Sequence, residues 1–333
     1  MHYLVTGGLG FIGSNFIEYN LKKKISIINV DNLSYAASKY RNNNFKKNKK
    51  YKFYSCSIGN KKKISHIFQK YKPAIIINFA AETHVDNSII RPVDFIKNNV
   101  LEFTQFLDEF KSYYNHSKNK KKIKFINVST DEVYGSLTKY EKKFTEKNKF
   151  FPNNPYSASK SAGDLIARAW NKTYNLPIIT TNCSNNFGPS QNKEKLIPKT
   201  IINALNKKKI PVYAKGKNIR DWIYVLDHCK VLNSIIKKGI SGEVYNIGGN
   251  NEIENIKIVN SICKILDKIK PLEEKKSYSN LIEFVKDRAA HDLRYGVDSS
   301  KIEKITGMKL KKQFNYNLKK TIVWYIENLD KNL

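Results

Sequence analysis

The chain has 333 residues, of which 41% are hydrophobic and 12% aromatic, and this composition indicates a folded globule and excludes a disordered chain. No apolar run reaches the roughly 18 residues of a membrane span, and the first residues lead directly into a predicted strand, so we expect a cytoplasmic protein without a membrane partner. The four cysteines are scattered and lack Cys–x–x–Cys spacing, which predicts reduced thiols and no metal site.

The net charge of +31 is typical of proteins that bind nucleic acid. The lysine-rich runs at 22–24, 46–50, 61–63, 118–124 and 207–209 lie between apolar segments and contain no nucleic-acid motif. We therefore interpret them as solvated surface and expect no nucleic-acid partner, because net charge affects solubility and encounter but not the fold. A non-enzymatic protein that binds polyanions remains the distant alternative.

Strands and helices alternate along the first half of the chain. Short apolar runs predict strands at 3–6, 25–30, 51–56, 74–80, 123–128 and 178–183. Helices are predicted at 11–21, 61–71, 93–114 and 156–174. This alternation predicts an α/β fold with a doubly wound parallel sheet of Rossmann type, covered by helices on both faces.

A glycine-rich loop joins the first predicted strand to the first helix. Gly7, Gly10 and Gly13 have the Gly–x–x–Gly–x–x–Gly spacing that lets a backbone approach a pyrophosphate at a helix N-terminus. Asp31 ends the next predicted strand, where an acid binds the adenosine ribose and repels a 2′-phosphate. The pattern therefore predicts NAD, in preference to NADP, as the cofactor.

The character of the chain changes near residue 185, where shorter segments rich in Arg, Asn and Tyr begin. We predict an NAD-binding Rossmann-type domain at 1–184 that carries the catalytic residues. A smaller lobe at 185–333 would mainly bind substrate, with some of its segments returning to the core.

A Tyr–x–x–x–Lys pair begins the helix predicted at 156–174. Together with a nearby hydroxyl, such a pair suits the transfer of a hydride to or from a sugar carbon. The spacing alone selects nothing, because it also starts at Tyr19, Tyr35, Tyr114, Tyr213 and Tyr316. Tyr156 differs by context, since Pro155 suits the first helical position and Lys160 shares its helix face. We expect the Lys160 ammonium and an oxidised nicotinamide to lower the pKa of Tyr156, and Thr130 to bind the same sugar oxygen.

Asp131 and Glu132 follow Thr130 directly. Hydride transfer does not need two further carboxyl groups, so this pair predicts proton chemistry, and therefore an elimination. Adjacent carboxyls can act as acid and base only if their surroundings separate their pKa values.

Several segments resemble those of a known family. They are residues 6–14 (TGGLGFIGS), 80–86 (AAETHVD), 129–135 (STDEVYG), 181–186 (TNCSNN), 194–198 (EKLIP), 219–222 (IRDW) and 287–292 (DRAAHD). Together they resemble the extended short-chain dehydrogenase/reductases and, among these, the dTDP-glucose 4,6-dehydratase family. The resemblance implies a lyase of dTDP-rhamnose and cell-surface polysaccharide biosynthesis, active as a homodimer on dTDP-glucose.

The resemblance also implies a division of catalytic work. Tyr156, assisted by Thr130 and Lys160, would take the 4-hydroxyl proton as a hydride leaves C4. Glu132 would then remove the C5 proton, and protonated Asp131 would donate to the departing 6-hydroxyl. Return of the hydride to C6 would give dTDP-4-keto-6-deoxyglucose.

Binding positions follow from the same resemblance. The residues implied for the cofactor are Gly7, Gly10, Phe11, Ile12, Gly13, Asp31, Asn32, Leu33, Ser34, Ser57, Ile58, Phe79, Ala80, Ala81, Thr83, Asn98, Tyr156, Lys160 and Asn186. Those implied for the substrate are Thr83, Thr130, Asn185, Lys195, Leu196, Pro211, Tyr213, Arg220, Asn255, Arg288 and His291.

The chain departs from the family pattern at three places. Ser57 stands where the family usually has an aspartate before the isoleucine that borders adenine. Asn98 stands where threonine is common, and residues 289–290 (AA) replace Pro–Gly, so the loop that carries Arg288 and His291 is expected to turn differently.

Two further questions stay open. A 4-epimerase or a UDP-sugar decarboxylase would share Tyr156 and Lys160 without needing the carboxyl pair, and a UDP-glucose dehydratase would keep both. For the homodimer we expect paired helices at 93–114 and 156–174, with Ser161, Ala162, Ala167 and Ala169 allowing close approach.

Overall fold

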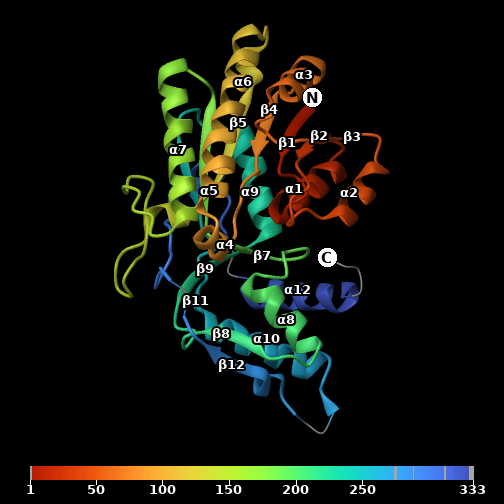
Figure 1. The fold of residues 1–333 in the computed structure, drawn as a ribbon, viewed down its shortest axis with the longest axis vertical. Helices are drawn as coiled ribbons and strands as arrows, with labels where there is room; N and C mark the ends of the chain where they lie inside the picture. Colours follow the sequence, from red (N-terminus) through yellow and green to blue (C-terminus); the bar gives the residue numbers. More distant parts are fainter. Residues whose placement is uncertain (1, 274–275, 288, 311–312, 330–333) are drawn as a thin grey trace.

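The computed structural model describes residues 2–273, 276–287, 289–310 and 313–329. Figure 1 shows two lobes, a larger one built on a twisted sheet and a smaller one that contains most of the C-terminal third. The larger lobe contains a parallel sheet of seven strands in the order β10-β6-β5-β4-β1-β2-β3. The predicted doubly wound parallel sheet is therefore confirmed.

The sheet strands are short and mostly buried. Their bounds are β1 (His2–Thr6), β2 (Ser26–Asp31), β3 (Tyr51–Ser55), β4 (Ile75–Asn78), β5 (Lys124–Thr130), β6 (Ile178–Cys183) and β10 (Val244–Ile247). The order of strands reverses at β1, since β2 and β3 lie on one side and β4 on the other. Ligands of doubly wound sheets bind at this reversal, beyond the carboxyl ends of the strands.

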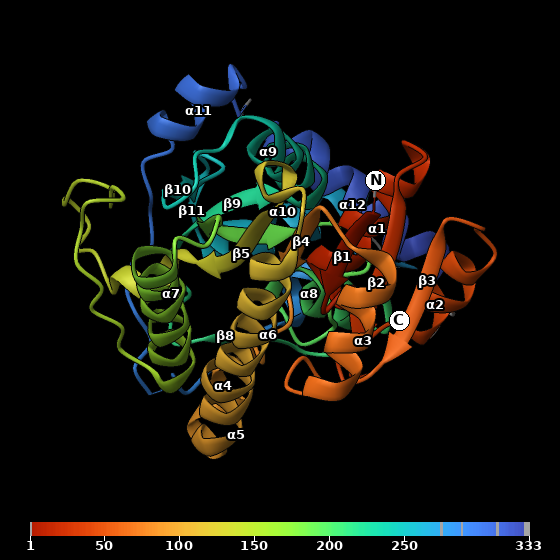
Figure 2. The same cartoon turned by 90° about the horizontal axis from the view of Figure 1, so that it is seen from above.

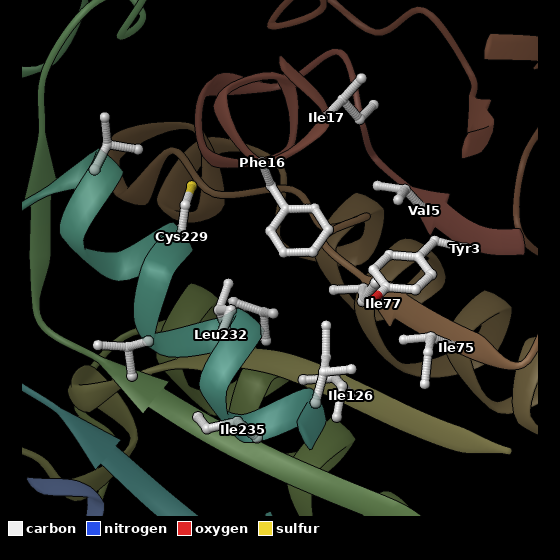
Figure 3. Packing of buried hydrophobic residues seen from close by; sticks show 14 of the residues in the cluster. Tyr3, Val5, Phe16, Ile17, Ile75, Ile77, Ile126, Cys229, Leu232 and Ile235 are labelled. Carbon is white, nitrogen blue, oxygen red and sulfur yellow. The ribbon is translucent and has the colours of Figure 1, made fainter. Parts of the chain in front are cut away.

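Alternate strand residues enter two cores, one on each face of the sheet. Tyr3 and Val5 pack against α1 (Phe11–Lys22) and α9 (Val225–Lys238), as Figure 3 shows around Phe16 and Leu232. Leu4 points into the opposite core, formed with α3 (Lys61–Tyr71), α6 (Phe103–His116) and α7 (Pro155–Tyr174). Figure 2 shows these helices along one side of the sheet. Burial on both faces explains why the strands read as continuous apolar runs.

The smaller lobe has its own apolar core. Its helices are α8 (Leu196–Leu205), α10 (Asn255–Ile269) and α12 (Phe314–Asn328). Its strands are β7 (Asn185–Phe187), β9 (Ile219–Tyr224) and β11 (Glu252–Glu254) in one sheet, and β8 (Ile210–Tyr213) and β12 (Ile282–Val285) in another. The remaining short elements are α2 (Lys39–Lys46), α4 (Val85–Ile90), α11 (Ser300–Thr306), and the 3-10 turns η2 (Lys120–Lys122), η3 (Asp131–Tyr134) and η5 (Tyr278–Leu281).

The two lobes are interleaved along the chain. After β7 and β9 have joined the smaller lobe, α9 returns to pack on α1, and β10 pairs with β6 at the sheet edge. The strand at this edge of the large sheet thus comes from the C-terminal half of the sequence.

The helix predicted at 93–114 is not uniform. It consists of α5 (Pro92–Ile96), a π-helical segment η1 (Lys97–Glu102), and α6. A π-helical turn closes i→i+5 hydrogen bonds and so has more residues per turn than an α-helix, which redirects the side chains that follow it. Periodicity of apolar residues does not reveal such a turn, because the apolar positions on both sides of it remain helical.

Within the described ranges, no helix combines the length and the apolar character that a membrane crossing needs.

Candidate active site

A cavity opens along the carboxyl ends of the central strands. Its lining contains most of the predicted ligand-binding and catalytic residues: Gly7, Gly10, Phe11, Ile12, Gly13, Asp31, Asn32, Ser34, Ser57, Ile58, Phe79, Ala80, Ala81, Thr83, Asn98, Thr130, Asp131, Glu132, Tyr156, Lys160, Asn185, Asn186 and Lys195. Leu33 differs from its neighbours, since it packs against the apolar core.

The glycine-rich loop crosses the end of β1 in close contact with the backbone of other segments. Gly7 has a φ of +63°, and a Cβ there would lie 2.5 Å from the Ala80 nitrogen. A Cβ on Gly13 would lie 2.5 Å from the Gly7 carbonyl oxygen. Both positions therefore require glycine. The result is an α1 N-terminus that points its free N–H groups at the cavity, which suits a pyrophosphate.

Asp31 holds this loop from the end of β2. Its carboxylate accepts hydrogen bonds from the backbone N–H of Leu9 at 2.9 Å and of Leu33 at 2.9 Å. Burial raises the pKa of Asp31, while these two backbone donors lower it. The side chain thus joins two loops and also faces the cavity.

The carboxyl pair lies at the end of β5. Thr130 accepts a hydrogen bond from the Glu132 N–H at 3.3 Å and thereby starts the 3-10 turn η3. Asp131 is buried, and its Oδ2 has no hydrogen-bond partner among the described residues. Burial, then the charges of Glu132 and Asp221, raises the pKa of Asp131 well above its usual range. This raised pKa favours the protonated form of Asp131 beside Glu132.

Tyr156 and Lys160 enter the cavity from the first turns of α7. Asn154 caps this helix in a capping box with Ser157, and Pro155 occupies the first turn. The Lys160 ammonium donates to the Val128 carbonyl oxygen at 3.1 Å, which anchors α7 to β5.

The expected lowering of the Tyr156 pKa is not what the protein alone produces. Burial and then the charge of Glu132 raise the pKa of Tyr156 well above its usual range, and a hydrogen bond with Thr130 lowers it only in part. Burial also lowers the pKa of Lys160. The sequence predicted that the Lys160 cation would lower the pKa of Tyr156, but it did not reveal the burial that raises this pKa.

Sequence reasoning missed a polar network behind Lys160. Asp164, one helical turn further along α7, accepts hydrogen bonds from Asn127 at 2.9 Å and from Asn182 at 3.0 Å. Burial raises the pKa of Asp164 to about 6, and the charge of Lys160 lowers it. The i, i+4 spacing from Lys160 was the available signal, but only the fold brings the two asparagines from β5 and β6 to the same point.

A second missed group faces the carboxyl pair from the C-terminal part of the chain. The Tyr295 hydroxyl donates to Asp292 and lies 3.4 Å from Glu132 Oε2. The Arg220 guanidinium stacks on the Tyr295 ring at 4.3 Å. The same guanidinium donates to the Asp292 carbonyl oxygen at 2.9 Å.

The remaining predicted substrate residues lie outside the cavity lining, in the smaller lobe. They are Leu196, Pro211, Tyr213, Arg220, Asn255 and His291. Tyr213 donates to Asp86 at 3.2 Å, and its ring meets that of His291 at 5.9 Å. Arg220 is buried and bonded to backbone carbonyls, so its predicted pyrophosphate contact stays a prediction. Arg288 lies outside the described residues.

The parallel sheet and the cavity that joins the glycine loop to Tyr156 and Lys160 define an extended short-chain dehydrogenase/reductase. A family described as GDP-mannose 4,6 dehydratase matches residues 4–321. The chain belongs to this dehydratase family.

Relatives and solved structures agree with this assignment. The dTDP-glucose 4,6-dehydratase of Escherichia coli is 43% identical over 98% of this chain and 94% of its own length. The dTDP-glucose 4,6-dehydratase of Bacillus anthracis, crystallised with NAD, has a TM-score of 0.87 and 41% identity, covering 98% of this chain and 97% of its own. The enzyme of that name from Streptomyces venezuelae, also solved with NAD, has a TM-score of 0.89 and 34% identity, covering 98% of each chain.

Proposed function

We propose that this protein is an NAD-dependent hydro-lyase that converts dTDP-glucose to dTDP-4-keto-6-deoxyglucose. The observation that carries the proposal is the pair Asp131–Glu132, which lines the same cavity as Tyr156 and Lys160. Oxidation at C4 needs only the tyrosine and the lysine, so two more carboxyls of different environment indicate a reaction that also removes water. The dTDP-glucose dehydratases to which the chain is 43% and 41% identical support the same substrate.

NAD is the cofactor that the cavity suits. The α1 N-terminus offers N–H groups to a pyrophosphate, and Asp31 offers a carboxylate to a ribose with a free 2′-hydroxyl. Two buried polar atoms in the lining, Ser184 Oγ and Asn185 Oδ1, have no protein partner among the described residues and are free to meet a ligand. When bound, NAD supplies the acceptor for a hydride from C4 and its return to C6.

In the proposed reaction, the side chains of this protein move three protons. Tyr156 takes the proton of the 4-hydroxyl, with Thr130 bonded to the same oxygen. The resulting 4-ketone acidifies the C5 proton, which Glu132 removes. Asp131 donates its proton to the 6-hydroxyl, which leaves as water, and the raised pKa of Asp131 supports this role. When C6 is reduced, the protonated Glu132 returns a proton to C5, which completes the 4-keto-6-deoxy product.

Lys160 has an electrostatic role in this proposal. Lys160 lines the same cavity as Tyr156, and its ammonium is anchored to the Val128 carbonyl oxygen at 3.1 Å. A positive charge stabilises a tyrosinate and so opposes the effect of burial on the tyrosine. Burial lowers the pKa of Lys160, but the charge of Asp164, whose carboxylate accepts hydrogen bonds from two asparagines, raises it and so favours the charged form.

We further propose that the protein acts as a homodimer. Five exposed apolar side chains, which we call the apolar face, lie on the adjoining helices α4, α5, η1 and α7: Ile90, Val93, Ile96, Leu101 and Leu165. Contiguous apolar side chains of this kind mark protein interfaces. Of the small residues expected there, Ser161 and Ala167 are buried inside the subunit, whereas Ala169 is exposed.

We also propose a cytoplasmic role in dTDP-rhamnose and cell-surface polysaccharide biosynthesis, as the family resemblance implies.

The decisive experiment is to incubate the purified protein separately with dTDP-glucose and UDP-glucose and to identify the products by mass spectrometry and NMR. We expect loss of one water and a 4-ketone from dTDP-glucose, without consumption of added reductant. A product of unchanged mass with inverted C4 would indicate an epimerase and contradict the proposal. A stoichiometric requirement for NADPH would contradict the assigned cofactor.

A further inference from the structure

The two ends of the cavity follow from the strand order. The glycine loop follows β1, Asp31 ends β2, and Ser57 lies just after β3, which is the next strand outward. A dinucleotide with its pyrophosphate at α1 and its ribose at Asp31 must extend its base towards the end of β3. At that end the lining residues include Ser57 and Ile58 on one side and Glu102 on the other.

Glu102 is a carboxylate held at this end of the cavity. The Ser57 hydroxyl donates to Glu102 Oε2 at 2.5 Å, and the Gly59 N–H in turn donates to the Ser57 oxygen at 2.9 Å. Gly59 leaves room for this arrangement, because a Cβ there would lie 2.9 Å from Glu102 Cγ. The glutamate therefore lies against the turn after β3 and is fixed by a hydrogen bond.

Glu102 ends the π-helical segment η1, which borders this end of the cavity. Asn98, about one π-helical turn earlier, also lines the cavity. Segments of this kind are frequent at functional sites, and here one presents two polar side chains to the same cavity.

The hydrogen-bonding capacity of Glu102 and Ser57 favours a dinucleotide whose base carries a hydrogen-bond donor. An ionised carboxylate only accepts hydrogen bonds, and it has about four lone-pair sites, so the bond from Ser57 leaves capacity for another donor. The exocyclic amino group of adenine is such a donor. We propose that Glu102 accepts a hydrogen bond from this amino group and is the residue by which the protein distinguishes adenine from other bases. This inference rests on the proposed use of NAD.

The proposal also accounts for one departure from the family pattern. Ser57 lacks the negative charge of the aspartate that is usual at its position, and Glu102 brings a carboxylate to its hydroxyl. The acidic group at this end of the cavity is thus supplied by η1 and not by the turn after β3.

The test compares NAD with its hypoxanthine analogue, in which a carbonyl oxygen replaces the amino group. Binding of each to nucleotide-free protein is measured by isothermal titration calorimetry, so the readout does not depend on turnover. Wild type should prefer NAD by about tenfold or more, because the carboxylate gains a charge-assisted bond from one base and repels the other. In E102Q the side-chain amide both donates and accepts, so the preference should fall close to one.

Two further variants complete the design. E102A should likewise lose the preference, with NAD weakened more than the analogue. D108N removes a carboxylate from the exposed side of α6, where Asp108 pairs with Lys111, and should keep the wild-type preference. An undiminished preference in both Glu102 variants, with NAD still bound, would overturn the inference and leave the proposed reaction intact. Failure of wild type to bind either dinucleotide would overturn the NAD assignment and this inference with it.

Discussion

At the scale of single residues, burial has the largest effect on the pKa values of several ionisable groups that line the cavity. It raises the pKa of Asp131 and of Tyr156 and lowers that of Lys160. The raised pKa of Asp131 suits its proposed role as an acid, whereas the proposed role of Tyr156 as a base requires a positive charge to offset the effect of burial. Each role depends on the surroundings of the group and not on its type.

Glu132→Gln tests the assigned base. The variant should still oxidise the 4-hydroxyl, because Tyr156 and Lys160 are unchanged, but it should dehydrate at least about a hundredfold more slowly. Reduced nicotinamide should therefore accumulate with substrate bound, which absorbance spectroscopy detects in single-turnover experiments. Dehydration at the wild-type rate would remove Glu132 from the mechanism.

Tyr156→Phe should block an earlier step. The ring and its packing against Phe95 are kept, so NAD binding should persist, but the proton acceptor for the 4-hydroxyl is lost. We expect neither reduced nicotinamide nor product after addition of dTDP-glucose. Comparison with the Glu132 variant separates the two steps, since a Tyr156 variant that accumulates reduced nicotinamide would contradict the assignment.

His228 provides a pH-dependent test of the environment around Asn186. It is buried in α9, its Nδ1 lies 2.9 Å from Asn186 Oδ1, and burial lowers its pKa to about 3. The native histidine thus stays neutral while the unfolded one protonates below about pH 6.5. Its contribution to stability is complete above that pH and is lost as the pH falls towards 3, by about 1.4 kcal/mol per unit.

The measurement is urea unfolding of wild type and His228→Asn between about pH 6.5 and about pH 4.5. Asparagine keeps an amide near the position of Nδ1, and the difference in unfolding free energy between the two proteins should shrink as the pH falls. His66→Asn, at an exposed histidine of α3, should follow wild type throughout. A difference that stays constant for His228→Asn would show that its environment does not hold it neutral.

At the scale of elements, η1 connects the loop after β4 to α7. Asn99 Oδ1 accepts from the Glu82 N–H at 2.8 Å, and Asn99 Nδ2 donates to the Glu82 carbonyl oxygen at 3.0 Å and to Ser159 Oγ at 2.9 Å. A single amide therefore fixes three elements that line the cavity. The segment that departs from α-helical geometry thus helps to hold the loop that follows β4.

Asn99→Ala should destabilise the protein by about 1–3 kcal/mol, because partners of a buried amide lose their hydrogen bonds. Urea unfolding at neutral pH measures this loss. Asn115→Ala, at an exposed position of α6, is the matched control and should change stability by less than about 0.5 kcal/mol. Equal stability of the two variants would show that the three contacts of Asn99 contribute nothing.

The strands and most helices could be predicted because their signals are local. The helix at 61–71 has the predicted bounds, since Asn60 caps it and apolar residues recur on one face. The π turn in η1 has no such signal. The grouping of Asp164 with Asn127 and Asn182, or of Glu132 with Tyr295, depends on how distant segments pack, which one sequence does not contain.

At the scale of the whole molecule, apolar attraction and charge oppose each other. The apolar face would bring two subunits together, whereas +31 charges on each repel at low ionic strength. At physiological ionic strength, salt screens the repulsion between exposed charges that are more than about 8 Å apart, and it leaves apolar burial unchanged. We therefore expect dimerisation to strengthen as salt is added up to that level.

Leu165→Glu should give a monomer at micromolar concentration and physiological salt, where wild type should be a dimer, because it places a charge on the apolar face. Light scattering coupled to size-exclusion chromatography measures the mass. Phe284→Glu changes an equally exposed side chain on β12 and should leave the dimer intact. A monomeric wild type would show that the apolar face does not join two copies.

The return of β10 and α9 to the larger lobe has a consequence for synthesis on the ribosome. Until residue 247 has emerged, β6 lacks its edge partner, and the face of α1 that meets α9 has no cover. An N-terminal fragment that ends near residue 184 would contain every catalytic group proposed here and still expose an unpaired strand and apolar side chains. The larger lobe can therefore finish folding only after β10 and α9 have been synthesised. The two lobes are thus completed together and not one after the other.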